Sequence, residues 1–397
     1  MKFIECKLSE LGEIVGGSTP FTKNESYYGG DIPWLTPKDL ANFNGRYINL
    51  GERNITEAGY KSTSVKMLPI NSVLFSSRAP IGYVAINNKN EVCTNQGFKS
   101  VIPNSKTNYM FLYYLLKYNK NKIEAMGSGT TFKEVSSTVM KNIIVNVPEA
   151  KEDQIKIGKI LSKIDDKIEL NTHTNDNLYK ILEQYIKEHY YNNEFVRNGN
   201  VNDIGKIQGG YVFKSKDLLN ETTNNKVLKI KNISASGVDI DNTQCVYDEV
   251  ANKVDKKFLL VRGNVIIAMT GAELGKTGYL YGQDYRYFLN QRVGVIRGND
   301  KYSELYLNCL FILNDMQNTL NSKGYGSAQP NISTSDIENI EIPIPKEDEL
   351  ETFYEKCNPI YSKMILNSEQ NQSLTQLRDT LLPKLMNGEI DLDKIEI

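Results

Sequence analysis

The sequence predicts an α+β protein with a pseudo-twofold internal repeat, in which two similar β-rich domains are joined by two long antiparallel coiled-coil helices. Three observations support this fold class. The first half of the 397-residue chain recurs in the second half. Each half begins with short apolar runs broken by Gly, Pro and Asn, which is typical of strands and turns. Each half ends in a long segment with helical periodicity.

The internal repeat is clearest at glycines and at the start of the long helical segments. Gly12, Gly16 and Gly17 recur as Gly205, Gly209 and Gly210, at an offset of 193 residues. The offset is 195 for two further matches, Thr94-Asn95-Gln96 with Leu289-Asn290-Gln291 and Lys151-Glu152-Asp153 with Lys346-Glu347-Asp348. Such a small drift indicates two homologous halves with minor loop insertions, and the period is too long for a solenoid unit.

The first block of each half predicts a mixed domain with many short strands. Strand-type runs include Ser72 to Phe75, Tyr83 to Ile86, Asn264 to Met269 and Arg292 to Arg297. One helical stretch lies near the end of each block, from Tyr109 to Lys122 and from Leu305 to Leu320. We expect their apolar face in the core, at Leu112, Leu115, Leu116, Leu307, Leu310 and Phe311. Trp34 is expected in the core rather than as a base-stacking platform.

Two long helical patterns follow, from Glu152 to Tyr191 and from Glu347 to Asn387. Their apolar positions form a heptad seam that ends, in the second pattern, with Leu374, Leu377, Leu381 and Leu385. The middle of the seam is polar, at Asn171, Asn175, Asn367 and Asn371. Buried asparagines cost stability but pair and specify register, so we expect one polar layer between antiparallel helices. The alternative is that these asparagines face solvent in an Asn-rich chain.

Composition excludes several classes of protein. The chain is 40% hydrophobic with a mean hydropathy of -0.43 and has no apolar run of membrane-spanning length, so we expect a cytoplasmic globular protein. Its five cysteines lie far apart without a CxxC pair, which predicts free thiols. The net charge of -1 does not by itself predict a polyanion partner. The net charge alternates along the chain, however, and is +6 in residues 1–148, -3 in 149–195, +1 in 196–345 and -5 in 346–397.

The chain resembles the specificity (S) subunit of type I restriction-modification systems in the order of four motifs: Gly16-Gly17-Ser18-Thr19-Pro20, Ile32-Pro33-Trp34-Leu35, Ser77-Arg78-Ala79-Pro80-Ile81-Gly82 and Asn95-Gln96-Gly97-Phe98. The second half departs from them, with Gly209-Gly210-Tyr211-Val212-Phe213 and Gly271-Ala272-Glu273-Leu274-Gly275 at the corresponding places. In that family, two target recognition domains each read one part of a split, asymmetric DNA sequence. The helices act as spacer and as docking surface for two methyltransferase (M) subunits.

The resemblance implies target recognition domains at 1–148 and 196–345, spacer and docking helices at 149–195 and 346–388, and a tail at 389–397. The implied partners are double-stranded DNA, two M subunits and, where a nuclease accompanies the complex, restriction (R) subunits. The implied role is noncatalytic. A two-headed protein-interaction scaffold without sequence-specific DNA binding is the alternative.

The chain shows no constellation for catalysis, a cofactor or a metal. The segment Gly271 to Thr277 resembles a phosphate-binding loop but is one residue short, and a strand rather than a helix is expected after it. His173 and His189 are expected on a polar helix surface. No Asn-Pro-Pro-Tyr or Asp-Pro-Pro-Tyr tetrapeptide is present to hold a flipped adenine, so methylation is assigned to another subunit.

Residues expected to contact DNA lie in loops of both blocks. Arg78 stands in a loop that presents its fork-shaped donor to guanine, whereas Lys276 and Thr277 are expected at DNA phosphate. The repeated Asn95-Gln96 and Asn290-Gln291 pairs are better explained as turn chemistry, because identical residues cannot distinguish two half-sites. The full set is Ser18, Thr19, Lys38, Arg78, Ser128, Thr130, Lys133, Tyr211, Lys214, Lys231, Lys276, Thr277, Tyr325, Ser327 and Gln329.

Overall fold

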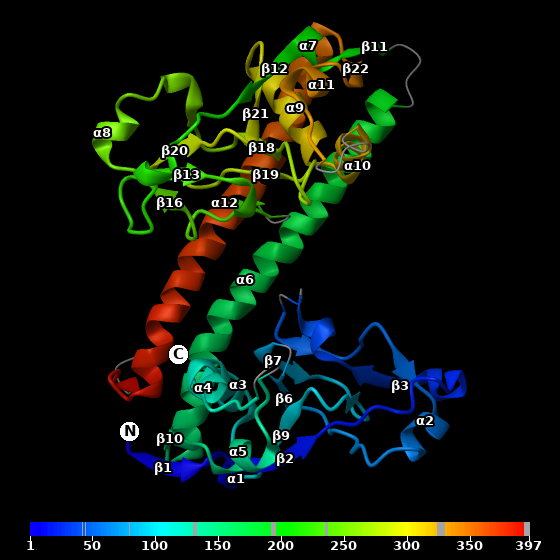
Figure 1. Ribbon diagram of the computed structural model, residues 1–397, viewed down its shortest axis with the longest axis vertical. Coiled ribbons are helices and arrows are strands. Elements are labelled where there is room, and N and C mark those ends of the chain that lie inside the picture. The colour runs from blue at the N-terminus through cyan, green and yellow to red at the C-terminus, as the bar shows by residue number, and fades with distance from the viewer. Residues whose placement is uncertain are drawn as a thin grey trace. The chain divides into compact units, whose positions relative to one another are not determined.

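The computed structural model describes residues 1–41, 43, 45–78, 80–129, 133–191, 196–234, 237–323 and 330–392. The chain divides into two compact units, one made of Met1–Glu169 with Leu374–Ile397 and the other of Leu170–Ser373. Each unit contains one β-rich body and a part of both long helices (Figure 1). The division therefore runs through the helices, whereas the sequence suggested boundaries at the helix ends.

The first unit is built on a five-stranded sheet with the order β2-β9-β6-β7-β4. Its strands are β2 (Gly12–Gly16), β9 (Lys99–Pro103), β6 (Val73–Ser77), β7 (Ile81–Asn87) and β4 (Tyr47–Ile48). Smaller sheets comprise β5 (Asn54–Ile55), β3 (Tyr28–Leu35) and β8 (Cys93–Thr94), and the pair β1 (Phe3–Lys7) and β10 (Ile144–Pro148). Short helices connect them: α1 (Leu8–Leu11), η1 (Glu25–Tyr27), η2 (Pro37–Leu40), α2 (Glu57–Lys61) and α5 (Ser137–Asn142).

The second unit has a corresponding sheet with the order β12-β21-β18-β19. Its strands are β12 (Gly205–Gly209), β21 (Val293–Gly298), β18 (Val265–Ala268) and β19 (Thr277–Tyr279). The sheet β16-β13-β20-β17 comprises Gln244–Cys245, Asn225–Leu228, Arg286–Leu289 and Leu259–Leu260, and the pairs are β11 (Arg197–Asn200) with β22 (Glu341–Ile344) and β14 (Ile233–Ser234) with β15 (Gly237–Val238). The short helices are α7 (Val201–Ile204), η4 (Ser215–Asp217), η5 (Ile230–Asn232), α8 (Asp248–Ala251), η6 (Lys256–Phe258) and α11 (Thr334–Glu338).

Strand pairing confirms the predicted repeat. Strands β3 and β8 run parallel with Trp34 opposite Cys93, and β13 and β20 run parallel with Val227 opposite Phe288. Trp34 and Val227 differ by the repeat offset of 193, and Cys93 and Phe288 by 195. The antiparallel pairs β1 with β10 and β11 with β22 correspond in the same way. The two halves therefore share these strand pairings and their register as well as sequence.

The helical stretch near the end of each block is interrupted rather than continuous. In the first half, α3 (Tyr109–Tyr118) and α4 (Lys120–Ala125) are separated at Asn119, whose side-chain amide donates to the carbonyl of Leu115 at 2.8 Å. In the second half, α9 (Lys301–Ile312) and α10 (Asn314–Lys323) are separated at Leu313, where the backbone is extended. The apolar face predicted for both stretches is buried, with exposures of 1% or less.

The two long helices are α6 (Lys151–Ile186), which continues into a π-helical turn η3 (Lys187–Tyr191), and α12 (Glu347–Met386). Within the second unit the side-chain amide of Asn171 donates to Asn371 and that of Asn367 donates to Asn175, at 2.9 and 2.8 Å. Because the lower number on α6 pairs with the higher number on α12, the helices are antiparallel there. No helix in the described part of the chain is both long and apolar enough to cross a bilayer.

The heptad pattern was wrong at Leu377, which is 47% exposed. The adjacent residue Arg378 points into the helix pair instead and binds Asp165 of α6. A pattern of apolar residues cannot reveal charged residues such as Arg378 and Asp165. The seam of the first unit therefore includes an ion pair that the heptad pattern did not predict.

Candidate nucleic-acid interface

The loop after the first strand of each large sheet is held against the repeated Asn-Gln turn. The backbone amide of Ser18 donates to the carbonyl of Thr94 at 3.0 Å, and that of Tyr211 donates to Leu289 at 2.8 Å. A Cβ atom added to Gly17 would overlap the carbonyl oxygen of Asn95, and one added to Gly210 would overlap that of Asn290. Glycine is required at both positions because two backbones approach closely there.

The first Asn-Gln turn behaves as turn chemistry predicts. The side-chain oxygen of Asn95 accepts from the backbone amide of Gly97 at 2.8 Å, which forms an Asx turn. Its neighbour Gln96 accepts a hydrogen bond from the hydroxyl of Thr19. Trp34 is 5% exposed and donates its ring N–H to the carbonyl of Ser18 at 3.0 Å, so it is a core residue as expected.

Arg78 lies at the end of β6 and faces Glu134 across an isolated β-bridge. Glu134 forms ion pairs with two cations, Arg78 at 3.6 Å and Lys99 at 3.3 Å, which leaves the group with one excess positive charge. Ser128 pairs with Glu134 through two backbone hydrogen bonds of 3.0 and 2.9 Å, and the exposed Lys133 directly precedes it. We call the loops that carry these residues, 17–20, 78, 95–98, 128–129 and 133–135, the first loop cluster.

Among the residues predicted to contact DNA, the structure thus brings Ser18, Thr19, Arg78, Ser128 and Lys133 together. Lys38 is exposed on η2 and pairs with Glu52 at 2.7 Å, and the preceding Pro37 lies against Gly97. Thr130, Tyr325, Ser327 and Gln329 lie outside the described residues.

The second half contains an equivalent loop cluster with other side chains, at 210–212, 269–271, 290–292 and 330–333. Its backbone framework matches that of the first. The backbone amide of Ser77 donates to the carbonyl of Gly97 at 2.7 Å, and the amide of Met269 donates to the carbonyl of Arg292 at 3.1 Å. An isolated β-bridge joins Arg78 to Glu134 in the first half and Thr270 to Asn331 in the second. Arg78 is therefore equivalent to Thr270, and Glu134 to Asn331. The cluster borders a cavity of about 440 Å³ lined by Met269, Thr270, Gln291, Arg292, Asn331, Ile332 and Ser333.

Of the described residues predicted to contact DNA in the second half, Tyr211 lies in this cluster and the others are scattered. Lys214, which precedes η4, and Lys231, which lies in η5, are exposed. The ring of Tyr211 packs edge-on against Phe213 and Phe258. Lys276 forms a 2.8 Å ion pair with Glu273. The prediction for Thr277 was wrong. This residue is 3% exposed in β19, and its hydroxyl donates to the carbonyl of Phe311 at 2.9 Å, so it cannot reach DNA phosphate.

The strand β19 follows the glycines of the segment 271–277, so the strand expected there in place of a helix is confirmed. His173 and His189 are exposed on α6 and η3.

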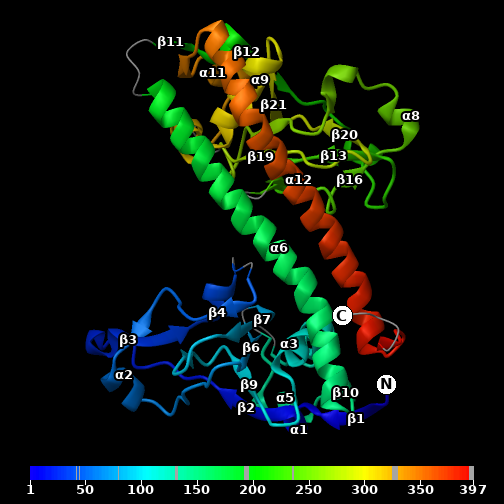
Figure 2. The ribbon, with the colours of Figure 1, turned by 180° about the vertical axis from the view of Figure 1, so that it is seen from behind.

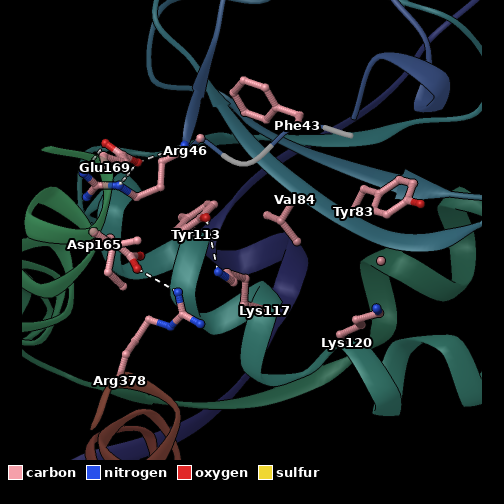
Figure 3. A pocket seen from close by; sticks show the side chains of 13 residues that line it. Phe43, Arg46, Tyr83, Val84, Tyr113, Lys117, Lys120, Asp165, Glu169 and Arg378 are labelled. Carbon is pink, nitrogen blue, oxygen red and sulfur yellow. Dashed lines mark hydrogen bonds and ion pairs between the residues drawn. The ribbon is translucent and has the colours of Figure 1, made fainter. Parts of the chain in front are cut away.

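In the first unit, the recognition body is joined to α6 and α12 by a network of charged side chains. Arg46 is 3% exposed and binds both Asp166 and Glu169 of α6. Figure 3 shows Arg46 and Glu169 beside Asp165, Arg378, Tyr113 and Lys117 at a cavity of about 350 Å³. Figure 2 shows α3 beside α6, and there the hydroxyl of Tyr114 donates to Asp165 at 2.6 Å. These contacts orient the first loop cluster relative to the helix segments of its own unit.

Burial determines how the groups of this network titrate. Burial, followed by the negative charge of Asp165, raises the pKa of the Tyr114 hydroxyl, which therefore stays a hydrogen-bond donor. Burial, followed by the positive charge of Arg378, lowers the pKa of Lys117. The ammonium of Lys117 lies 5.2 Å from the ring centre of Tyr113, a cation–π contact that partly offsets its desolvation.

Sequence reasoning missed Arg46, Asp165 and Arg378. Only the last two had a local signal. Asp165 lies four residues after Leu161 and Arg378 four after Leu374, which is the spacing of seam positions. A charged residue at such a position on each of two paired helices is a detectable hint of an interhelical ion pair.

Comparison with known proteins decides the family. Residues 2–180 and 193–376 each match the model of the type I restriction modification DNA specificity domain. The chain belongs to this family. The two matches coincide with the two halves of the internal repeat. The specificity subunit of type I systems determines which DNA sequence is bound and is itself noncatalytic, since catalysis belongs to the M and R subunits with which it assembles.

Individual relatives agree. The chain is 34% identical over 413 residues to the type I restriction enzyme MjaIX specificity subunit of Methanocaldococcus jannaschii, covering 98% of this chain and 94% of that protein. It is 23% identical over 461 residues to the HindI specificity subunit of Haemophilus influenzae, covering 98% and 92%. The crystal structure of a type I S subunit from M. genitalium shares the fold, with a TM-score of 0.61 and 18% identity over 97% of this chain and 96% of that one.

Proposed function

We propose that this specificity subunit recognises a bipartite, asymmetric DNA sequence, with each β-rich body reading one part. The observation that carries the proposal is that two loop clusters with the same backbone framework present different side chains. Arg78, Gly97 and Glu134 in the first correspond to Thr270, Arg292 and Asn331 in the second. A shared framework positions each cluster on DNA, while different donors and acceptors select different bases.

The target recognition domains proposed for the two half-sites are 1–148 and 196–345, and the two long helices are proposed to set the spacing between the half-sites. The acidic balance of the helical segments, -3 and -5, disfavours DNA contact along the helices and suits a protein partner.

Two M subunits are the proposed occupants of the helix surfaces. Exposed apolar side chains recur on both helices at the repeat offset of 196: Leu170 and Ile181 on α6 correspond to Leu366 and Leu377 on α12, with exposures of 58%, 50%, 49% and 47%. The two apolar residues on each helix are eleven positions apart, which is about three turns, so they lie on one face of that helix. Equivalent surfaces on a repeated scaffold favour two copies of one partner. R subunits join where a nuclease accompanies the complex.

An exchange of recognition domains tests the proposed function. Residues 1–148 are replaced by the equivalent block of a relative with a different target, and the methylated sequence is read from the DNA of cells that carry the hybrid and its M subunit. We expect one half of the methylated sequence to change and the other to be kept. A change in both halves or in neither would refute modular reading. Absence of any sequence preference in the unaltered complex would favour the interaction scaffold instead.

The docking surface has a separate test. Leu170→Asp and Leu366→Asp each place a charge in one apolar pair, and each variant should bind one M subunit in place of two by native mass spectrometry. Ile155→Asp is the matched control, because Ile155 is 43% exposed on α6 but corresponds to Glu351 on α12. We expect this control to keep two M subunits. Loss of both copies in either single variant would contradict two equivalent sites.

A further inference from the structure

The second loop cluster contains an arginine at a position where the first has a glycine. The backbone carbonyl of Arg292 accepts from the amide of Met269 at 3.1 Å. In the first half, the carbonyl of Gly97 accepts the equivalent hydrogen bond from the amide of Ser77. Conversely, the position of Arg78 is occupied by Thr270, on the facing strand end. Each cluster therefore has one arginine, but the two arginines project from different loops of the same framework.

The surroundings of the two arginines also differ in charge. Arg78 is paired with Glu134, which also binds Lys99. The equivalent of Glu134 is Asn331, which is neutral. None of the described residues that line the cavity at Arg292 is acidic, and no ion pair joins Arg292 to a described residue. Its guanidinium is thus an exposed positive charge at a polar cavity, with no ion-pair partner among the residues that the structure describes.

The neighbouring side chains are suited to base edges rather than to phosphate alone. Gln291 and Asn331 are exposed amides that line the cavity, and Thr270 and Ser333 add hydroxyl groups. Amides offer both a donor and an acceptor, which matches adenine, and the two parallel donors of arginine match O6 and N7 of guanine. A phosphate site would instead be expected to gather further cations or backbone amides.

We infer that Arg292 is a specificity-determining residue that reads a guanine in the half-site recognised by the second domain. This inference rests on the proposed function and deepens it, because it names the base and the side chain. The guanidinium enters the major groove from the 290–292 loop, and Gln291 and Asn331 flank the same base pair or its neighbour. Moving the arginine from the strand end at 78 to the loop at 292 shifts the position of the guanine contact relative to the shared framework.

The test uses the full chain with its M subunit on a library of randomised target sites, read by methylation. Arg292→Ala should lower the preference for guanine at one position of one half-site by about 5- to 150-fold, the range of a bidentate contact, and leave the other half-site unchanged. Arg292→Lys keeps the charge but not the fork, so overall binding should persist while the guanine preference falls. Arg286→Ala is the control, because Arg286 is a half-buried arginine of the same domain that contacts Asn252 and Asp248 instead.

Three outcomes overturn the inference. Uniform weakening on all sequences, restored by Arg292→Lys, would make Arg292 a phosphate contact. An unchanged target sequence in Arg292→Ala would exclude any reading role. Altered preference in both half-sites would mean that the effect is structural. The proposed function fails separately, when the unaltered complex shows no bipartite sequence at all.

Discussion

Asp165 and Arg378 form a buried ion pair between α6 and α12 in the first unit, with their nearest atoms 2.8 Å apart. Their side chains are 6% and 17% exposed, and the second carboxylate oxygen of Asp165 accepts from Tyr114 at 2.6 Å. One carboxylate therefore links α12, α6 and the helix α3 of the recognition body. Removing one member of such a pair leaves the other charge buried without a partner.

We predict that Arg378→Ala lowers the free energy of unfolding by about 3 kcal/mol, because it leaves the buried Asp165 carboxylate without its cationic partner. The matched control is Asp379→Ala. Asp379 also contacts Arg378 at 2.8 Å, but its side chain is 59% exposed, so we expect a loss below about 1 kcal/mol. Urea unfolding followed by circular dichroism measures both. Equal losses in the two variants would contradict a special role for the buried pair.

A second prediction concerns the asparagines of the second unit. Asn367 is 1% exposed and donates to Asn175 at 2.8 Å, so Asn367→Leu leaves a polar partner unsatisfied and should cost about 1–3 kcal/mol. Replacing Asn171, Asn175, Asn367 and Asn371 together by Leu removes both sides of the pairing. We expect this variant to be more stable than the single variant in urea but less uniform in helix register. A larger loss in the fourfold variant would refute this account.

A third prediction concerns the glycines at the loop clusters. Gly17→Ala and Gly210→Ala should each destabilise by about 1–3 kcal/mol, because the new methyl group meets a backbone carbonyl. The preceding glycines are matched controls. A Cβ atom at Gly16 would have no neighbour closer than 3.9 Å, and one at Gly209 none closer than 3.6 Å. Thermal unfolding should separate the two pairs of variants, and a similar loss at Gly16 would show that strand propensity, not close approach, is responsible.

A fourth prediction concerns Arg78. Its replacement by Ala should cost about 1–3 kcal/mol of binding at one base position in the half-site of the first domain, as the loss of a bidentate contact would. Lys133→Ala, in the same cluster, should weaken binding on all sequences and reduce its salt dependence. Binding of the assembled complex to matched duplexes with single base changes measures both. Equal weakening on every duplex in Arg78→Ala would instead make Arg78 a phosphate contact.

Sequence alone determined the repeat, the strand-rich blocks, the extent of the long helices and their polar middle. These features depend on local periodicity and on glycine positions, which a chain carries wherever it folds. The Asn95 turn and the core position of Trp34 followed for the same reason, since turn chemistry and large apolar area act over short distances.

Tertiary structure alone decided which polar side chains are buried and which are exposed. Thr277 looked like a phosphate ligand, yet its side chain is buried and its hydroxyl donates to the carbonyl of Phe311 in α9. Leu377 looked like a seam residue, yet Arg378 takes the inward position because Asp165 lies opposite on α6. Arg292 has no sequence motif, and its placement at a cavity depends on strands and loops more than twenty residues away along the chain. Charge pairing and exposure are relations between distant residues, so they arise only when the chain has folded.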